Sequence, residues 1–145
     1  MEKLVIKGGK KLEGEINIQG AKNSSLPLLA AAILCKGETI LHNCPNLSDV
    51  KAAGDILEYI GCKTRLENNS FIIETTSIKN YEISDSLMRQ MRSSVVFLGA
   101  IIGRLGRAKI SFPGGCEIGS RPIDLHLSAL RDLGVIIDEM GGILD

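Results

Sequence analysis

Tryptophan is absent from this chain of 145 residues, and aromatic side chains make up only 3% of it. So few rings exclude the aromatic platforms on which proteins commonly stack bases and sugars. Seventeen basic and seventeen acidic side chains cancel, so bulk charge gives no reason to expect binding to nucleic acid or to an anionic membrane. No uninterrupted apolar run is long enough to span a bilayer, and the first twenty residues lack the apolar core typical of a secretory signal.

The cysteines lack the spacing of a metal site or of a disulfide framework. There are four of them, none in a CxxC pair, and only two histidines accompany them. Cys35 ends an apolar segment and Cys62 follows a helix end, so both are predicted to pack as small apolar groups. Cys44 lies in a loop with no cation nearby. We therefore expect a cytoplasmic protein of a reducing compartment.

The chain contains an internal repeat. The segment "SSLPLLAAAILCKGETI", from Ser24, resembles "SSVVFLGAIIGRLGRAKI", from Ser93, at an offset of 69 residues. Farther along, "DILEYIGCK" resembles "SALRDLGVI" at an offset of 73. Because the offset grows from 69 to 73, the second copy has four extra residues, which we expect in the loop "FPGGCEIGSRPID".

Each copy is predicted to fold as a helix, a strand, a second helix and a hairpin. The first helix, residues 26–34 or 95–105, is apolar almost all round and should be buried on every side. The second helix is amphipathic and ends at Gly61 or Gly134, each a candidate left-handed cap. The segment after each glycine alternates around a turn, as a hairpin does. The apolar positions of the two amphipathic helices are Val50, Ala53, Ile56, Leu57 and Ile60 in the first copy, and Leu125, Leu127, Leu130 and Leu133 in the second.

Buried helices with strands outside them predict an α/β (α+β) repeat fold. Residues 1–21 contain "KLVIKG" and "GEINIQG", which we expect to form a separate strand pair belonging to another lobe. Residues 22–145 then hold repeat one, about 22–80, and repeat two, about 81–145. Repeat architectures generally need about three units to close a core. The sequence is therefore expected to be the N-terminal part of a longer protein.

The stretch "GAKNSS", residues 20–25, lies where a strand gives way to the first apolar helix. Backbone N–H groups and the helix dipole favour an anion there, and Lys22 adds a point charge suited to phosphate or carboxylate. The alternative is a helix start capped by serine, with a solvated lysine. In the second copy "RQMRSS", residues 89–94, places Arg92 at the corresponding helix start, so the two starts can address one anionic ligand. Arg89 is equally well interpreted as a solvated surface charge.

Cys116 lies in the Gly-rich loop, five residues before Arg121. Cations and helix N-termini lower the pKa of a thiol and favour nucleophilic or acid–base use. Pro122 suits the first position of the next helix, and Asp124 suits its first turn, where the dipole favours carboxylates. The alternative is a loop cysteine without a chemical role. His126 has no partners that would make a catalytic triad.

Three motifs together resemble the N-terminal part of the UDP-N-acetylglucosamine 1-carboxyvinyltransferases, a branch of the enolpyruvyl transferase family: "GAKNSSLPLLAAAIL", "MRSS" and "PGGCEIGSRPIDLHL". The resemblance covers the whole chain, and the loop from Pro113 to Leu127 is highly specific to it. The sister branch, which acts on shikimate 3-phosphate, shares the repeat fold but lacks the Gly-Gly-Cys loop. The resemblance implies an inside-out α/β barrel built from βαβαββ-type repeats with buried helices, here incomplete.

The resemblance implies transfer of the enolpyruvyl group of phosphoenolpyruvate to the 3-hydroxyl of UDP-N-acetylglucosamine, with release of phosphate. This is the first committed step of peptidoglycan synthesis, and neither a metal nor an organic cofactor is implied. Cys116 matches a lid cysteine that donates a proton, can form a covalent adduct and is the target of fosfomycin. The other matches are Lys22, Asn23 and Arg121 for phosphoenolpyruvate, and Asn23, Arg92, Arg121, Pro122, Ile123, Asp124 and Leu125 for UDP-N-acetylglucosamine.

The family's general base and further arginines belong to a second lobe, which the resemblance makes the required intramolecular partner. This chain is therefore expected to hold half a site and to show no turnover by itself. Two alternatives stay open: a sister transferase acting on shikimate 3-phosphate, and a truncated repeat module without catalysis that binds a nucleotide sugar or nothing.

Overall fold

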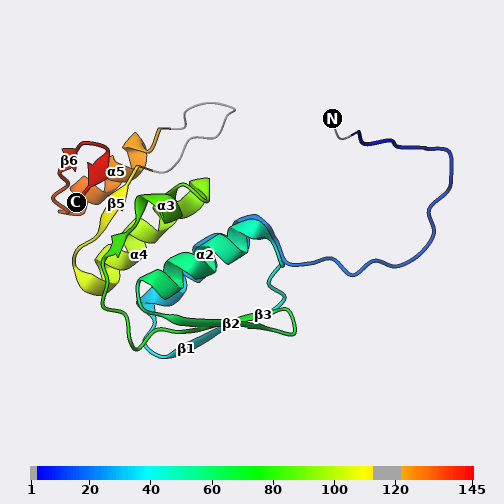
Figure 1. Cartoon of the computed structure of the whole chain (residues 1–145), viewed down its shortest axis with the longest axis horizontal. Helices are drawn as coiled ribbons and strands as arrows, with labels where there is room; N and C mark the ends of the chain where they lie inside the picture. Colours follow the sequence, from blue (N-terminus) through cyan, green and yellow to red (C-terminus); the bar gives the residue numbers. More distant parts are fainter. Residues whose placement is uncertain (1–2, 113–121) are drawn as a thin grey trace.

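The computed structural model describes residues 3–112 and 122–145. Two small sheets flank a group of helices, and an extended N-terminal segment leads into this body (Figure 1). The elements of the first half are α1 (Lys22–Ala31), the 3₁₀ helix η1 (Ala32–Leu34), β1 (Glu38–Leu41), α2 (Ser48–Tyr59), β2 (Lys63–Glu67) and β3 (Ser70–Glu74). Those of the second half are β4 (Glu82–Ile83), α3 (Asp85–Met88), the 3₁₀ helix η2 (Arg92–Val95), α4 (Val96–Leu105), β5 (Lys109–Ser111), α5 (Asp124–Asp132), β6 (Glu139–Met140) and β7 (Ile143–Leu144).

The hairpin predicted after Gly61 is confirmed as β2 and β3, joined by Asn68 and Asn69. Both asparagines have positive φ, +47° and +61°, the conformation of a tight turn whose twist matches the flanking strands. Asparagine tolerates this conformation better than most residues because its short polar side chain can bond locally. The first sheet has the order β1-β3-β2 and is antiparallel throughout.

The second sheet has the order β4-β5-β7-β6, with β4 parallel to β5 and the other pairs antiparallel. Its hairpin, predicted in the last residues of the chain, is confirmed as the short strands β6 and β7. Gly141 and Gly142 connect them with φ of +59° and +82°. Glycine adopts positive φ without the steric cost that a Cβ brings.

Left-handed glycines end both amphipathic helices, as predicted. Gly61 follows α2 with φ +107°, and Gly134 follows α5 with φ +89°. At Gly61 the chain also passes close to its own backbone, because an added Cβ would lie 2.8 Å from the carbonyl oxygen of Ser77. These caps let the chain reverse into each hairpin.

The core is centred on α1 and α4. Leu29 and Ile33 from the first half and Phe97 and Ile101 from the second are 0% exposed, and burying each such side chain contributes about 1.5–3 kcal/mol. The expectation that α1 is buried on every side is wrong, since Leu28 is 52% exposed. Among the described elements α1 packs chiefly against α2 and α4, which leaves one side uncovered. No helix in the described ranges is long and apolar enough to cross a membrane.

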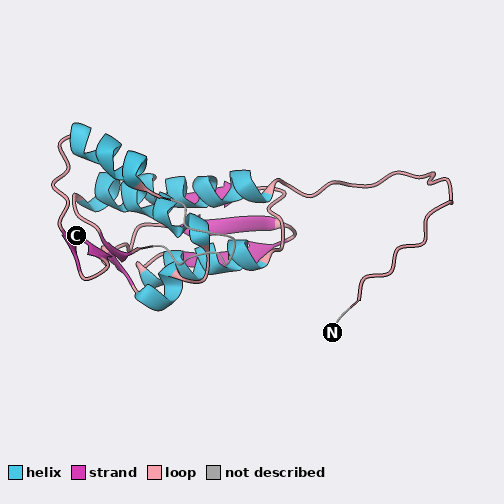
Figure 2. Cartoon of the chain, turned by 90° about the horizontal axis from the view of Figure 1, so that it is seen from above, coloured by secondary structure: helices cyan, strands magenta, loops and turns pink. Residues whose placement is uncertain are grey.

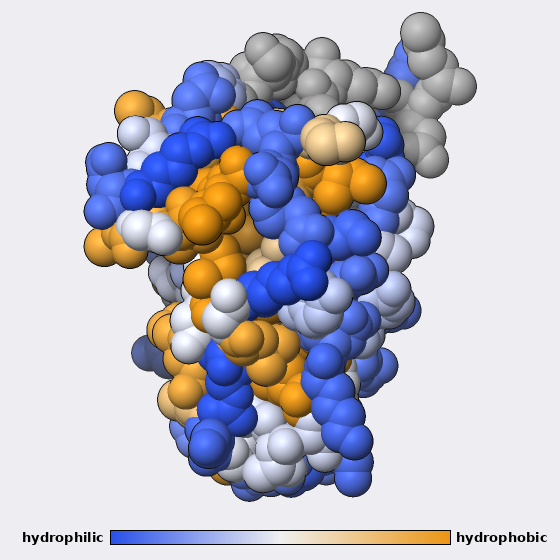
Figure 3. Space-filling view, turned by 90° about the vertical axis from the view of Figure 1, so that its left-hand side faces the viewer, coloured by the Kyte–Doolittle hydropathy of each residue, from blue (hydrophilic) through white to orange (hydrophobic). Residues whose placement is uncertain are grey.

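The second amphipathic helix is covered less completely than its counterpart. All five predicted apolar positions of α2 are at most 2% exposed. In α5, Leu127 is buried and Leu125 is 88% exposed, and Leu133, directly after the helix, is 82% exposed. The predicted burial of Leu125 and Leu133 is therefore wrong. Figure 3 views the molecule from this end and shows apolar side chains at the surface among polar ones.

Residues 3–20 contain no strand, so the strand pair expected in residues 1–21 is not formed in the described part of that segment. Figure 2 shows it leaving the body as an extended chain. Six large apolar side chains are 75–94% exposed there: Leu4, Val5, Ile6, Leu12, Ile16 and Ile18. Two strands without a covering layer are marginal in water, which is the physical reason for the difference. The assignment of the segment to another lobe stays a prediction.

Candidate anion-binding site

The starts of α1 and α4 face the same end of the molecule. The two helices pack along each other, and a Cβ added to Gly103, near the end of α4, would lie 3.1 Å from Leu34 Cδ2, just past the end of α1. Because their C-terminal ends adjoin, the helices run in the same direction. Lys22 opens α1 and Arg92 opens the 3₁₀ turn before α4, so both cations belong to the same end.

Gly20 fixes the start of α1 against the loop that follows β1. Its backbone N–H donates to the carbonyl oxygen of Asn43 at 3.1 Å. A Cβ at this position would lie 2.1 Å from the same oxygen, far inside van der Waals contact, so no side chain fits. The absence of a side chain at Gly20 therefore allows the close backbone approach that places Lys22.

The first turn of α1 is stabilised by a hydrogen bond from a side chain of the helix to the backbone carbonyl before it, and not by a side chain that caps the first N–H groups. Ala21 occupies the N-cap position, and the buried Ser25 Oγ donates back to the carbonyl oxygen of Ala21 at 3.0 Å. The alternative in which a serine caps this helix is therefore wrong. Because no side chain in the described ranges caps it, its first backbone N–H groups are free to meet an anion.

Lys22 forms an ion pair with Asp49, in the first turn of α2. Lys22 Nζ lies 2.5 Å from Asp49 Oδ2, and the two side chains are 46% and 28% exposed. Asn23 follows Lys22 on the exposed side of the helix start. The two helix starts thus present a lysine, an asparagine and a carboxylate together.

Asp49 was missed by the sequence analysis. A carboxylate in the first turn of a helix is favoured by the dipole alone, so its presence there suggests no partner. A signal was available in the repeat, because the offsets of 69 and 73 align Lys22 with Met91 and Asp49 with Pro122. At those aligned positions the first copy has opposite charges and the second has none, although Arg92 and Asp124 stand one and two residues farther along.

Arg92 is half-buried at the start of the second central helix. The serine that follows it by two residues, Ser94, is 0% exposed and donates to the carbonyl oxygen of Met88 at 3.0 Å, much as Ser25 does in the first half. Arg89 points elsewhere. Its Nε donates to Asp85 Oδ2 at 2.6 Å, which raises the pKa of Arg89 and lowers that of Asp85. The interpretation of Arg89 as a surface charge is confirmed.

Two of the predicted site residues, Cys116 and Arg121, lie outside the described residues. Pro122 is exposed two positions before the first helical residue of α5, so its predicted place at the first helical position is wrong. Asp124 is in the first turn, as predicted. Ile123 is half-buried and Leu125 is exposed. Their contribution to the site of Lys22 stays a prediction.

The remaining thiols are free cysteines. Burial raises the pKa of Cys62 to about 11, with Arg104 opposing the shift, so this thiol is inert near neutral pH, as expected of a packing residue. Burial also raises the pKa of Cys44, against a hydrogen bond with Ser25. Cys35 is exposed, so its predicted burial is wrong. In the described ranges no group of three or more His, Cys, Asp or Glu side chains is placed to hold a metal ion.

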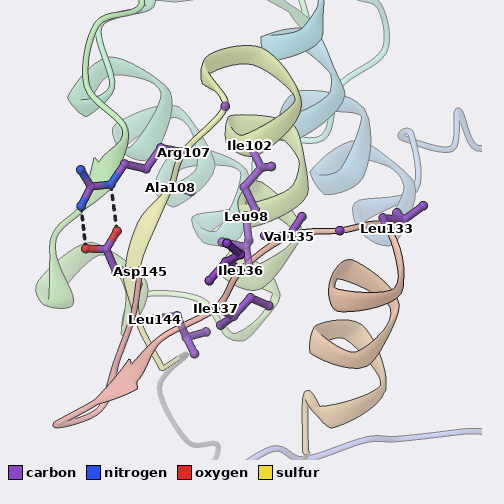
Figure 4. Close-up of a pocket in the computed structure, with 12 residues that line it drawn as sticks. Leu98, Ile102, Arg107, Ala108, Leu133, Val135, Ile136, Ile137, Leu144 and Asp145 are labelled. Carbon is purple, nitrogen blue, oxygen red and sulfur yellow. Dashed lines mark hydrogen bonds and ion pairs between the residues drawn. The ribbon is translucent and has the colours of Figure 1, made fainter.

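A cavity of about 380 Å³ lies elsewhere, between α4, the segment before β5, the chain after α5 and the end of β7 (Figure 4). Most of its lining is aliphatic, including Leu98, Ile102 and Ile137. Its charged groups are Arg107 and Asp145, which pair through two hydrogen bonds of 3.0 and 2.8 Å. Because these charges neutralise each other, the cavity is not suited to a multiply charged anion.

The structure defines a class of α/β repeat protein in which parallel apolar helices lie inside, small sheets lie outside, and cations stand at the helix starts. A family model described as EPSP synthase (3-phosphoshikimate 1-carboxyvinyltransferase) matches residues 6–144. The chain belongs to this family.

Curated relatives and a solved structure agree with this assignment. The UDP-N-acetylglucosamine 1-carboxyvinyltransferase 2 of Caldanaerobacter subterraneus subsp. tengcongensis is 53% identical over 142 residues, which is 98% of this chain and 34% of the relative. The UDP-N-acetylglucosamine 1-carboxyvinyltransferase of Thermotoga maritima is 46% identical over 145 residues, 100% of this chain and 34% of the relative. The chain thus spans about a third of the length of these relatives.

The crystal structure of the enolpyruvyl transferase NikO from Streptomyces tendae superposes with a TM-score of 0.78 at 22% identity. The match covers 94% of this chain and 30% of that one. The chain therefore has part of the enolpyruvyl transferase fold, and the predicted fold class and resemblance are confirmed.

Proposed function

We propose that this chain forms the first part of a UDP-N-acetylglucosamine 1-carboxyvinyltransferase. The observation that carries the proposal is Lys22 at the open start of α1, on the same end of the molecule as Arg92. Such a pair of helix starts suits two anionic substrates, a phosphoenolpyruvate and a nucleotide sugar. The names of the curated relatives supply the substrate pair.

The proposed reaction is an addition followed by an elimination. The 3-hydroxyl of the sugar loses its proton and bonds to C2 of phosphoenolpyruvate, while C3 gains a proton and becomes a methyl group. The C2–O bond to phosphate then breaks, and the methyl group loses a proton to restore the double bond. The products are the enolpyruvyl ether and inorganic phosphate, so no oxidant, reductant or cofactor is consumed.

The described residues take binding roles in this proposal. Lys22 contacts the phosphoenolpyruvate anion, Asn23 touches both substrates, and Arg92 faces UDP-N-acetylglucosamine. Lysine is a suitable phosphate ligand because its ammonium is a compact charge with three donors. The exposed start of α5, with Pro122, Asp124 and neighbouring residues, contacts the uridine nucleotide.

Two further roles fall on residues outside the described ranges. Cys116 donates the proton to C3, can form a covalent adduct with phosphoenolpyruvate, and is the site of fosfomycin attack. Arg121 faces both anions. A thiol suits the first role when cations and a helix start surround it.

The rest of the proposal concerns the longer protein. Residues 22–145 are two of three repeats of one lobe, and residues 1–21 belong to a second lobe that supplies the general base. The protein acts in the cytoplasm, in the first committed step of peptidoglycan synthesis, and thereby supports cell shape and division. The 145-residue chain alone holds half a site and has no turnover.

Titration of the chain with phosphoenolpyruvate tests the central claim. Lys22→Met removes the charge and introduces the residue that the second repeat carries at the aligned position, so the scaffold should accept it. Binding is expected for the parent chain and for Lys51→Met, an exposed control on α2, and is expected to be lost in Lys22→Met. Equal binding by all three would remove Lys22 from the site.

A second candidate is a transferase acting on shikimate 3-phosphate, which the description of the family model favours. Parallel titrations with UDP-N-acetylglucosamine and shikimate 3-phosphate separate the two. We expect chemical-shift changes at Pro122, Asp124 and neighbouring residues with the nucleotide sugar only. A response to shikimate 3-phosphate alone supports the second candidate, and sustained phosphate release by the isolated chain overturns the half-site proposal.

A further inference from the structure

The Lys22–Asp49 ion pair joins the first residue of α1 to the first turn of α2. Among the ion pairs of the described residues, Asp49 is the least exposed carboxylate, at 28% of its side chain. A carboxylate withdrawn from water to this degree favours a fixed cationic partner. The contact therefore restrains a lysine that would otherwise explore many rotamers.

The repeat indicates that the scaffold itself does not need this ion pair. Aligned with Lys22 and Asp49 are Met91, which is 3% exposed, and Pro122. The second half has Arg92 at the start of the turn before α4 and Asp124 in the first turn of α5, but among the described residues these two form no ion pair with each other. A purely structural explanation of the Lys22–Asp49 pair is weakened accordingly.

The Lys22–Asp49 ion pair is also unexpected in a site that must attract an anion. A carboxylate beside the lysine lowers the local positive potential and opposes an incoming phosphate. An aspartate at this position needs a compensating benefit, and restraint of the lysine supplies one. An ammonium has three donors, so an ion pair with Asp49 leaves donors for a ligand.

We propose that Asp49 is a positioning residue that holds the Lys22 ammonium between the starts of α1 and α2, directed at the anionic substrate. The proposal deepens the proposed function and rests on it for the identity of the anion. It assigns Asp49 no contact with phosphoenolpyruvate and no proton transfer.

The direction in which Asp49→Asn changes phosphoenolpyruvate binding distinguishes two roles for Asp49: positioning Lys22, or only balancing its charge. Asp49→Asn keeps the size of the side chain and makes the site more positive by one charge. If Asp49 is only a counter-ion, this variant binds phosphoenolpyruvate more tightly. If Asp49 positions Lys22, the variant binds more weakly despite the added positive charge, and Asp49→Glu restores part of the loss.

Two measurements are made on the parent chain, Asp49→Asn, Asp49→Glu and the control Asp55→Asn. Asp55 is half-buried on the same helix, about two turns farther on. The first measurement needs no ligand: amines are acylated with a limiting reagent, and the labelling of Lys22 is compared by peptide mapping with that of the exposed Lys63. The second is titration with phosphoenolpyruvate. Thermal unfolding verifies that each variant is folded.

We expect Asp49→Asn to increase labelling of Lys22 relative to Lys63 severalfold and to weaken phosphoenolpyruvate binding about fivefold, which corresponds to about 1 kcal/mol. Asp49→Glu should fall between Asp49→Asn and the parent chain, and Asp55→Asn should match the parent. Unchanged labelling of Lys22, or tighter binding by Asp49→Asn, overturns the positioning role. If the parent chain does not bind phosphoenolpyruvate, the proposed function fails, and the labelling result alone decides whether Asp49 restrains Lys22.

Discussion

Replacing Gly20 with alanine tests whether the start of α1 is held by its close approach to the loop after β1. The new Cβ would lie 2.1 Å from the carbonyl oxygen of Asn43, so the two backbones must separate by about 1 Å or more to reach the usual contact distance. Such a movement breaks the Gly20–Asn43 hydrogen bond, now 3.1 Å long. Alanine suits the backbone at Gly20, because φ there is not in the left-handed region. The expected effect is therefore steric alone.

The magnitude follows from the two losses. Asn43 is exposed and Gly20 half-buried, so water can replace the lost hydrogen bond, which then costs about 0.5–1.5 kcal/mol. Overpacking adds about 1–3 kcal/mol when the surroundings yield only in part. Because residues 3–19 are exposed, the lower half of the combined range applies, and we expect a loss of about 1.5–3 kcal/mol in the free energy of unfolding. That is a large fraction of the ~5–15 kcal/mol typical of a domain.

Urea unfolding followed by far-ultraviolet circular dichroism measures the loss, with Gly99→Ala as the matched control. Gly99 lies inside α4, and a Cβ there would meet nothing within 4 Å, so this change should raise stability by about 0.5–1 kcal/mol through helix propensity. The reasoning is refuted if Gly20→Ala changes the free energy of unfolding by less than about 0.5 kcal/mol, or if both variants change it alike.

Four further measurements examine the core, the thiols and the hairpin. Leu29→Ala should cost about 2–5 kcal/mol of unfolding free energy, whereas Leu28→Ala, at a position 52% exposed, should cost far less; similar losses would contradict the assigned burial. The pKa of Cys62, ordinarily 9.0, is raised to about 11 by burial. The unfolded chain therefore ionises first as pH rises, and stability should fall by roughly 2–3 kcal/mol between the two pKa values, a slope that Cys62→Ala should remove. At neutral pH a thiol reagent should modify Cys35, which is exposed, before Cys62, and the reverse order would oppose the structure. Asn69, at φ +61°, should accept glycine with little change, while valine should cost about 1–2 kcal/mol; equal melting temperatures for these two variants would argue against the left-handed turn.

The sequence predicted best those features that depend on neighbours along the chain. The hairpin around Asn68 and Asn69 and the helix ends at Gly61 and Gly134 require particular backbone angles, and a few residue types provide them. Periodicity likewise identified α2, whose apolar face meets a complete set of partners. These elements were therefore recognisable from residues only a few positions apart.

Features that depend on covering layers were predicted less well. Leu28, Leu125 and Leu133 are as apolar as their buried neighbours, but no pattern within a helix tells whether another element will cover a given side. The strands expected in residues 1–21 failed for the same reason, since pairing needs a partner surface. Burial in a repeat fold is decided by adjacent units, which a single helix does not encode.

The candidate site lies between these two cases. Lys22 and Arg92 were predicted because each stands at a helix start that the sequence itself marks. Asp49 was not, because its contact with Lys22 depends on the bond between Gly20 and Asn43, which brings the loop after β1 against the start of α1. A close approach between two backbones is marked in the sequence only by a glycine. Because glycines are common in this chain, Gly20 alone does not predict the contact.

Comparison of the two halves separates what the fold needs from what the site adds. Ser25 and Ser94 each return a hydrogen bond to a preceding backbone carbonyl, and Gly61 and Gly134 each end a helix with positive φ. These pairs are alike because both units must begin and end their helices in the same way. The aligned positions at the helix starts are unlike: Lys22 stands opposite Met91, Asn23 opposite Arg92, and Asp49 opposite Pro122. Both units have a cation at the start of the central helix and an acid in the first turn of the amphipathic helix, but in the described part of the chain only Lys22 and Asp49 of the first unit form an ion pair. Each unit therefore presents its cation at a helix start, where an anion is favoured, in a different setting.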